Sequence, residues 1–353
     1  MSHALLGAAA AYAFARTRNR LTLATGAVGA LLPDVDVLIG SSSDPLLALE
    51  YHRHFTHSFF AAPFGALIVA GLMWLALRRK AELVPLFWSA LAGYISAILL
   101  DACTSYGTQL LWPFSDRRFS ASIVAVIDPV VTIVLAAGVI AALRSAAARP
   151  AQIAIGIVAL YLGCGWLQRE RAEGLVERMA LARGHTISQH EVKPTLGNLL
   201  LWRSVYLSGK DYRVDAVRVG LFSAPVLYPG GAARRVEPID LVPPLTINSV
   251  QAADAVRFAK VSEGYLARDP GRPNVIGDVR YSILPNSTLP LWAIEVMPER
   301  EDQHVTFHNY REFTKQDRER FFAMLRGVAP GSLVAPEPKS VKQDYKGRGK
   351  TSK

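Results

Sequence analysis

The first half of the chain is a series of long apolar runs separated by short charged loops. A hydrocarbon core needs about 20 helical residues, and four runs with at most one charge reach or approach that length. They are residues 58–77, 83–100, 121–143 and 151–167. Two shorter runs, 4–15 and 21–33, precede them and predict a shallow helical hairpin. The pattern predicts an α-helical integral membrane domain with four long transmembrane helices and a short N-terminal hairpin.

The pattern changes after residue 168. Residues 169–183 read as an amphipathic helix with Leu175, Val176, Met179 and Ala180 on one face. Short strand-like runs bounded by Pro, Gly and Asn follow, and a helix over 315–325 ends the pattern. The strand-like runs are 214–222, 279–284, 291–296 and 305–308. We expect a membrane domain over 1–168, a soluble α+β or mostly β domain over 169–326, and a disordered basic tail over 327–353.

Composition supports a membrane protein. The chain is 51% hydrophobic and 19% charged, which is too apolar for a soluble protein of 353 residues and excludes overall disorder. The net charge is +10. Beside a membrane, a basic surplus reflects topology and lipid headgroups more often than nucleic-acid binding, so no nucleic-acid partner is expected. Cys103 and Cys164 lie in or beside apolar runs and indicate neither a disulfide framework nor a thiolate metal site.

Basic residues predict the orientation of the membrane domain. Three groups fall in alternate loops: Arg16, Arg18 and Arg20; Arg78, Arg79 and Lys80; Arg144 and Arg149. Lys and Arg in short loops stay on the cytoplasmic side, so all three groups can be cytoplasmic together. The N-terminus, loops 34–57 and 101–120, and everything after about residue 168 then lie on the outer face. The basic residues come after the first apolar run, so no cleaved signal peptide is expected.

Histidines and carboxylates gather on that outer side. Four of the eight histidines lie within the first 57 residues. The candidate ligands are His3, Asp34, Asp36, His52, His54, His57, Asp101 and Asp128. Imidazole with carboxylate is the ligand set of Zn²⁺ or, with more oxygen, of Mn²⁺ or Fe²⁺. Carboxylates within a bilayer are costly unless they pair or line a site. If a helix begins at His54, then His54 and His57 face the same way, and Thr56 or Ser58 is placed to orient a ligand.

Structural explanations exist for individual members of this set. Asp34 and Asp36 are also suited to capping a helix, and Asp128-Pro129 to forming a kink with a hydrogen-bonded carboxylate. Asp101 has Arg117 and Arg118 as alternative partners. Jointly, however, His and Asp side chains on one rim favour a metal site. His304 and His308 are spaced so that they would lie on one face of a strand. The sequence around His185 and His190 gives no indication of a site.

Several short motifs in order resemble the YdjM-like membrane-bound metal-dependent hydrolases. The motifs are Ser2-His3-Ala4-Leu5-Leu6-Gly7, Leu32-Pro33-Asp34-Val35-Asp36, His52-Arg53 with Thr56-His57-Ser58, Leu100-Asp101 with Thr104-Ser105-Tyr106-Gly107-Thr108 and Pro113-Phe114, and Ile127-Asp128-Pro129. The resemblance implies an inner-membrane protein related to the zinc-dependent phospholipase C and single-strand nuclease clan. It also implies His3, Asp34, Asp36, His52, His57 and Asp101 as ligands, with Arg53 and Thr56 supporting them.

The chain departs from that pattern at one position. Many members carry a His four residues before the Asp that matches Asp101, and here that position is Ala97. An i,i+4 His/Asp pair would supply two ligands from one helix, so its loss bears on the number of metals. His54 is a candidate replacement, and Asp128 and Thr56 are further possible members of the site.

These observations predict a hydrolase in the bacterial inner membrane that depends on a divalent metal, Zn²⁺ first, and acts on a small-molecule or lipid phosphoester. Asp36 or Asp34 would act as base or bridging ligand, and Arg53 would clamp the phosphate. The alternative is a non-catalytic scaffold or regulator whose soluble domain binds a protein partner. A third reading is a cation or proton transporter that uses Asp101 and Asp128 as relay carboxylates.

Overall fold

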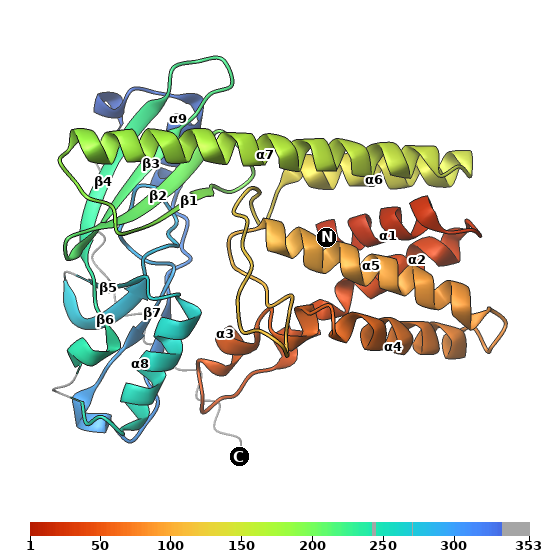
Figure 1. The fold of residues 1–353 in the computed structure, drawn as a ribbon, viewed down its shortest axis with the longest axis horizontal. Coiled ribbons are helices and arrows are strands. Elements are labelled where there is room, and N and C mark those ends of the chain that lie inside the picture. The colour runs from red at the N-terminus through yellow and green to blue at the C-terminus, as the bar shows by residue number, and fades with distance from the viewer. Residues whose placement is uncertain (242–244, 270, 334–353) are drawn as a thin grey trace.

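The computed structural model describes residues 1–241, 245–269 and 271–333. Helices form the N-terminal half, two sheets form the C-terminal half, and one long helix runs through both (Figure 1). The helices are α1 (Ser2–Phe14), α2 (Arg20–Leu31), α3 (Leu47–Tyr51), α4 (Ala61–Ala76), α5 (Leu83–Cys103), α6 (Pro129–Ser145) and α7 (Arg149–Ala182). Two 3₁₀ turns, η1 (Pro33–Leu38) and η2 (Phe55–His57), connect them. Every predicted apolar run is therefore at least partly helical, including the N-terminal hairpin.

The prediction of four long spans is not confirmed. Within the described residues, only α5 and α7 are long and apolar enough by themselves to cross a membrane. The segment 47–57 and α4 together would make a third span, bent by 84°. Helix α6 is shorter than its apolar run because the Asp128 side chain caps it and Pro129 occupies its first turn. Residues 121–128 are consequently not helical.

The helical bundle presents apolar side chains outward. Exposed examples lie on three helices: Leu67 and Leu72 on α4, Ile133 on α6, and Ile153 and Leu160 on α7. In water such a surface would be costly, whereas against lipid it is the expected outer face. The α1–α2, α4–α5 and α6–α7 connections all lie at the end of the bundle away from the sheets (Figure 1).

Close packing of α1, α2 and α5 depends on glycine. A Cβ on Gly93 of α5 would collide with the carbonyl of Gly26 on α2, and a Cβ on Gly7 of α1 would meet the same carbonyl. Small residues allow helix backbones to approach closely, as they do in membrane helix pairs. This packing brings the start of α1, the end of α2 and the end of α5 together.

The C-terminal half contains two antiparallel four-stranded sheets. The first has the order β1 (Gln189–Pro194), β2 (Leu201–Ser208), β3 (Asp211–Arg218) and β4 (Val226–Arg234). The second has the order β5 (Leu266–Asp269), β6 (Arg272–Asp278), β7 (Trp292–Glu295) and β8 (Thr306–Asn309). Helices α8 (Val250–Val261) and α9 (Lys315–Arg326) and the 3₁₀ turns η3 (Pro238–Leu241), η4 (Pro298–Arg300) and η5 (Pro330–Ser332) complete it.

The expectation of a C-terminal sheet domain is confirmed, with differences at its ends. Helix α7 crosses residue 168 without a break, and its half beyond that residue packs Val176 and Ala180 against the first sheet. Residues 279–284 are not a strand, because the Asp278 carboxylate accepts the Arg280 N–H and turns the chain. Residues 327–333 pack onto the domain through Leu333 and η5. The remainder of the predicted tail, 334–353, lies outside the described residues.

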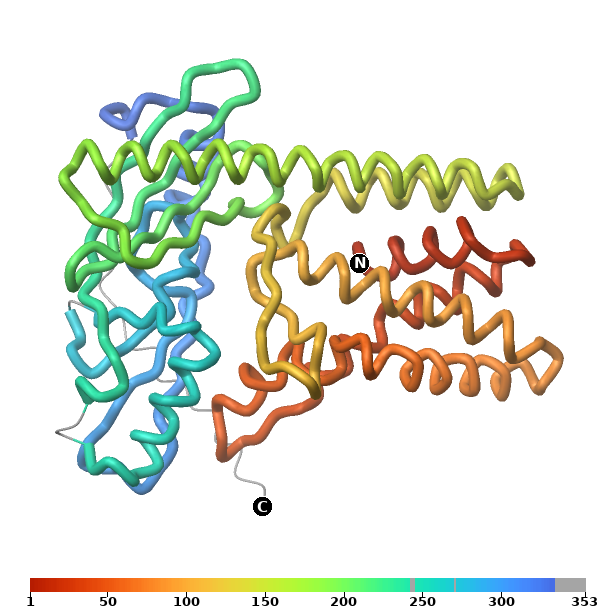
Figure 2. The backbone as a smooth tube through the Cα atoms, viewed as in Figure 1, coloured from red at the N-terminus to blue at the C-terminus, as the bar shows by residue number. Residues whose placement is uncertain are grey.

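The two halves are in direct contact. Leu46, from the loop before α3, is buried in a cluster with Phe258 of α8 and Trp292 of β7. Arg257 of α8 forms ion pairs with Asp44 at 2.8 Å and with Glu50 at 2.7 Å. The segment that joins α5 to α6 lies between the helices and the sheets (Figure 2). The C-terminal domain therefore rests on the loops at one end of the bundle.

Candidate metal centre

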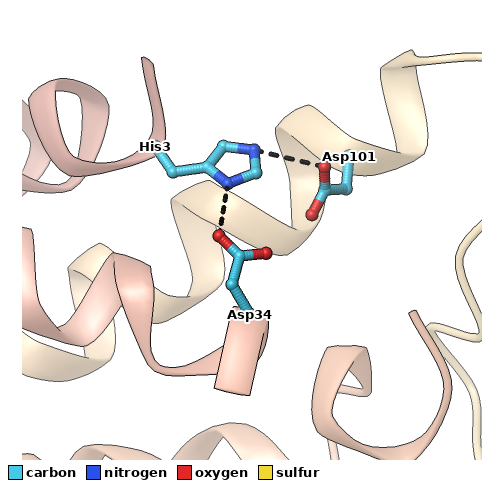
Figure 3. A group of neighbouring side chains, drawn as sticks. All are labelled: His3, Asp34 and Asp101. Carbon is cyan, nitrogen blue, oxygen red and sulfur yellow. Dashed lines mark hydrogen bonds and ion pairs between the residues drawn. The ribbon is translucent and has the colours of Figure 1, made fainter. Parts of the chain in front are cut away.

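Four side chains from four segments converge at this end of the bundle. His3 lies between two carboxylates (Figure 3): its Nδ1 is 3.3 Å from Asp34 Oδ2, and its Nε2 is 3.2 Å from Asp101 Oδ1. His57 Nε2 approaches the same two residues, at 3.5 Å from Asp34 Oδ1 and 3.2 Å from Asp101 Oδ2. One ligand atom each from His3, Asp34 and Asp101 lie within 4.8 Å of one another. We call these four residues the metal cluster.

The metal cluster contains buried polar atoms that form ion pairs with one another and with Arg53 but, in the residues that the structure describes, lack well-formed hydrogen bonds. Among the described residues, His57 Nε2 and both carboxylate oxygens of Asp101 accept or donate no hydrogen bond of acceptable geometry. His57 is 0% and Asp101 is 1% exposed. A buried polar atom without a partner costs about 1–3 kcal/mol. Two imidazoles and two carboxylates form a donor set that suits Zn²⁺, so the residues present fit a divalent metal.

Asp36 lies on the other side of His57. Its Oδ2 is 3.3 Å from His57 Nδ1, and its Oδ1 is 3.4 Å from His52 Nδ1. It also accepts the backbone N–H of Arg53 at 2.7 Å. Thr56 Oγ1 is 3.1 Å from His57 Nδ1 and donates to Asp36 at 3.5 Å. A carboxylate behind an imidazole orients its ring and fixes its tautomer, which is the arrangement found behind ligating histidines.

Arg53 has a left-handed backbone, with φ at 56°. This conformation is uncommon for a residue other than glycine, and such strain is concentrated at functional sites. Its guanidinium lies 2.6 Å from Asp101 Oδ1 and donates to Thr104 Oγ1 at 2.6 Å. Arg53 is 5% exposed. The side chain therefore holds Asp101 in place and is not directed outward as a phosphate clamp would be.

The carboxyls of η1 have perturbed acidity. Burial by itself would raise the pKa of Asp34, but the neighbouring His3 and His57 imidazoles outweigh it and leave the pKa well below its ordinary value. Burial likewise opposes the shift at Asp36, and hydrogen bonds from His52, His57 and the Arg53 N–H lower its pKa. Both groups are thus anionic near neutral pH, as metal-binding carboxylates must be.

Two residues that the sequence proposes for the site, His54 and Asp128, lie elsewhere. The ring of His54 is 6.1 Å from the Trp112 ring, between centroids, and no described contact joins it to the carboxylates. Asp128 caps α6 by accepting from Val130 and Val131, and it accepts the Tyr161 hydroxyl at 2.9 Å. Ala97 is fully buried in α5 and has no ligating atom. The i,i+3 argument for His54 fails because residues 52–57 are not an α-helix.

The proposed pairing of Asp101 with Arg117 or Arg118 is also wrong. Arg53 is the partner of Asp101, while Arg118 donates to the backbone carbonyls of His52 at 3.1 Å and Glu50 at 2.9 Å. Arg117 lies over the Phe119 ring, at 5.3 Å from its centroid. Arg118 thereby braces the chain that carries His52.

Support for the site comes from residues that the sequence did not single out. Tyr94 of α5 donates a hydrogen bond to the Thr56 carbonyl. Tyr106 packs its ring 5.0 Å from that of His52 and 5.6 Å from the Arg53 guanidinium. From the C-terminal domain, the Tyr281 hydroxyl donates to the Ser105 carbonyl at 2.7 Å. In the sequence, only the motif at 104–108 pointed to a role for Thr104 and Tyr106, and no feature pointed to Tyr281.

Comparison with known proteins bears on the N-terminal half. Residues 1–172 match the YdjM inner membrane protein family, and this range contains the whole metal cluster. The uncharacterized protein YfhP of Bacillus subtilis (strain 168) is 28% identical over 105 residues, which are 30% of this chain and 32% of YfhP. The match thus spans about a third of that relative. No solved structure matches the chain.

Proposed function

From the match of residues 1–172 to an inner membrane protein family, we propose that this protein is a membrane-bound, metal-dependent hydrolase of phosphoesters. The observation that carries the proposal is the convergence of His3, His57, Asp34 and Asp101, whose imidazole nitrogens and carboxylate oxygens face one another at 3.2–3.5 Å. Such a donor set suits a divalent ion, and perturbed titratable groups gather at functional sites. The resemblance of the motifs to the YdjM-like membrane-bound metal-dependent hydrolases supports the same chemistry.

The residues divide into ligands and supports. We assign His3, Asp34, His57 and Asp101 as ligands of one Zn²⁺-class ion, with Mn²⁺ or Fe²⁺ as alternatives. When bound, such an ion polarises a phosphoryl oxygen and makes a water more acidic. Asp36 and Thr56 orient His57, His52 lies against Asp36, and Arg53 holds Asp101.

Access to the cluster is from the side of Asp34. The Asp34 side chain is 37% exposed, whereas those of Asp36 and Asp101 are 0% and 1% exposed. Asp34 is therefore the ligand placed to lie next to a bound substrate. Asp36 is enclosed and has its oxygens directed at His52 and His57, which suits a positioning role.

We further propose that the cluster and the C-terminal domain face the outside of the inner membrane, in a multi-pass topology. The α1–α2 connection with Arg16 and Arg18, the α4–α5 connection with Arg79 and Lys80, and the α6–α7 connection, which Arg149 follows as the first residue of α7, lie at the opposite end of the bundle (Figure 1). Cytoplasmic retention of these basic residues would orient the protein in this way. A reporter fused to the C-terminus tests the orientation, and a cytoplasmic signal would contradict it.

Metal analysis of the purified protein tests whether the metal cluster binds an ion, on which the proposed function depends. Wild-type protein in detergent should retain about one divalent ion per chain after dialysis. The variant His3→Ala plus His57→Ala should retain none. His54→Ala is the matched control, because His54 lies in the same segment outside the cluster, and it should bind metal like wild type. Equal metal content in all three proteins would refute the site.

Turnover separates an enzyme from a scaffold. Wild-type protein loaded with Zn²⁺ should hydrolyse bis(p-nitrophenyl) phosphate, and chelation should abolish the reaction. Asp34→Asn should remove turnover, while His54→Ala should keep it. Metal bound by wild type without turnover of any phosphoester would instead favour a scaffold with a structural ion.

A further inference from the structure

A cluster of exposed aromatic and apolar side chains lies beside the metal cluster. It consists of the exposed Phe59, Phe60, Phe64, Leu111 and Phe114 together with the half-buried Trp112, and we call it the aromatic patch. Phe60 is at its centre, with its ring 5.4 Å from Phe64, 6.2 Å from Trp112 and 6.2 Å from Phe114, between centroids. Phe114 is 84% exposed. A contiguous group of exposed apolar side chains, unlike a single one, marks a contact with a partner or with the membrane.

The aromatic patch is continuous with the apolar face of α4. Phe64, Leu67, Ile68, Leu72 and Leu75 are all exposed and follow helical spacing along one side of that helix. Helix α4 has 16 residues, so this face is only about 24 Å long, shorter than a hydrocarbon core of about 30 Å. The aromatic patch extends the same face beyond the first residue of the helix.

Charged residues begin where the aromatic patch ends. Two residues after Phe114, Asp116 is exposed and pairs with Lys260 of α8 at 3.4 Å. Large aromatic rings followed at once by solvated charges are the pattern of a membrane interface, where such rings lie at the level of the headgroups. This pattern identifies lipid, and not a protein, as the occupant.

The aromatic patch and the metal cluster share one rigid segment. His57 precedes Phe59 by two residues, and the Phe55 ring lies 5.9 Å from the Trp112 ring. The backbone of this segment is also bonded to the patch loop, because Phe59 N–H donates to the Leu110 carbonyl at 2.9 Å. Val37 and Leu38 of η1, just after Asp36, are exposed as well. Apolar surface thus lies on two segments that carry ligands.

We infer that the aromatic patch lies in the headgroup layer of the membrane and that it presents the metal cluster to phosphoesters carried by membrane lipids. The substrate part of this inference rests on the proposed function, whereas the position of the patch does not. A lipid phosphate at that depth reaches the exposed side of Asp34 without leaving the bilayer, while its acyl chains remain in the hydrocarbon core.

Spin labelling tests the position of the patch. A nitroxide is attached at Phe114→Cys, with Cys103→Ala and Cys164→Ala removing the native thiols, in full-length protein in phosphatidylglycerol-containing vesicles. A label at Arg234→Cys on β4 is the control, because that side chain is 58% exposed on the sheet domain. Residue 114 should be more accessible to oxygen than to a water-soluble nickel chelate, and residue 234 the reverse. Equal behaviour at both positions would overturn the inference.

Hydrolysis tests the substrate class. The variant Phe60→Ser plus Phe114→Ser should lose about tenfold or more of its turnover of phosphatidylglycerol in vesicles, since two large apolar contacts with lipid are removed. Its turnover of water-soluble bis(p-nitrophenyl) phosphate should stay at the wild-type level. Equal loss on both substrates, or loss on neither, would overturn the substrate assignment. If wild type hydrolyses neither substrate, the proposed function fails, and the label at residue 114 still decides the patch.

Discussion

Two regions of this protein bury charged side chains, and they treat them differently. In the C-terminal domain, Arg280 is 3% exposed and its guanidinium contacts Asp278 at 2.8 Å, Glu263 at 2.9 Å and the Val261 carbonyl at 3.1 Å. In the metal cluster, His57 and Asp101 are as deeply buried, and Asp101 has the Arg53 guanidinium at 2.6 Å, but His57 Nε2 faces the Asp34 and Asp101 carboxylates at 3.5 and 3.2 Å without a well-formed hydrogen bond within the described part of the chain. A satisfied buried ion pair has a structural explanation, whereas imidazoles and carboxylates that converge in this way also suit the ligands of a metal ion.

The largest expected effect comes from removing the buried ion pair of Arg280 and Asp278 in the C-terminal domain. Arg280→Met would leave the Asp278 carboxylate buried without its cation, which costs about 3–5 kcal/mol in comparable cases. We expect the C-terminal domain to unfold at a much lower temperature, as measured by near-UV circular dichroism in detergent. Arg234→Met, on the exposed face of β4, is the control and should change little. Similar unfolding temperatures for the two variants would show that Arg280 is not structural.

The metal cluster should respond in the opposite way. Asp34→Asn removes a ligand that is partly exposed, so the unfolding temperature of the metal-free protein should change little. Zn²⁺ at 100 times its dissociation constant should stabilise wild type by about 2.7 kcal/mol and should not stabilise the variant at the same concentration. The measurement is the unfolding temperature with and without Zn²⁺. Equal stabilisation of both proteins would remove Asp34 from the ligand set.

Part of this contrast could be predicted from the sequence, and part could not. The apolar runs located α1, α2, α4, α5, α6 and the first half of α7 but not the short α3, and the positions of His3, Asp34 and Asp101 at run ends placed them on one rim. His54 was grouped with His57 on the condition that a helix begins at His54, but residues 55–57 form a 3₁₀ turn that follows the left-handed Arg53. No local sequence pattern predicts a left-handed backbone at an arginine.

The strands illustrate a second limit. β2 was missed because seven of its eight residues are buried, so it shows no alternation of apolar and polar positions. The helix α6 was predicted too long because apolar character continues through residues 121–127 although the chain there is irregular. Contacts that join the halves, such as Tyr281 with Ser105, link residues 176 positions apart and leave no local pattern.

An intermediate effect is expected at the boundary of the two regions. Tyr281→Phe removes the hydrogen bond to the Ser105 carbonyl, next to Thr104 and Tyr106, which contact Arg53 and His52. Loss of such outer support costs about 10- to 100-fold in metal affinity, and we expect the lower end of that range. Titration with Zn²⁺ measures the affinity.

The control for Tyr281 is Tyr228→Phe. Tyr228 also donates a buried hydroxyl to backbone carbonyls, those of Met324 and Val328, but it lies within the C-terminal domain. It should lower stability without changing metal affinity. If both variants bind Zn²⁺ as wild type does, the C-terminal domain covers the metal cluster without helping to position it.

The smallest effect concerns a surface charge pair that belongs to neither buried region. His190 of β1 lies 2.9 Å from Glu173 of α7, and this hydrogen bond, the largest contribution, raises the His190 pKa above its ordinary value of 6.5. A raised pKa means that the stabilisation is fully present below pH 6.5 and is lost as pH rises through the folded-state pKa. His190→Gln should therefore lower stability by about 0.2–1 kcal/mol near pH 6 and by nothing near pH 9, as measured by denaturant unfolding. A loss of the same size at both pH values would show that His190 contributes by packing and not by charge. The contact between His190 and Glu173 would then not be an ion pair, unlike the buried contact between Arg280 and Asp278.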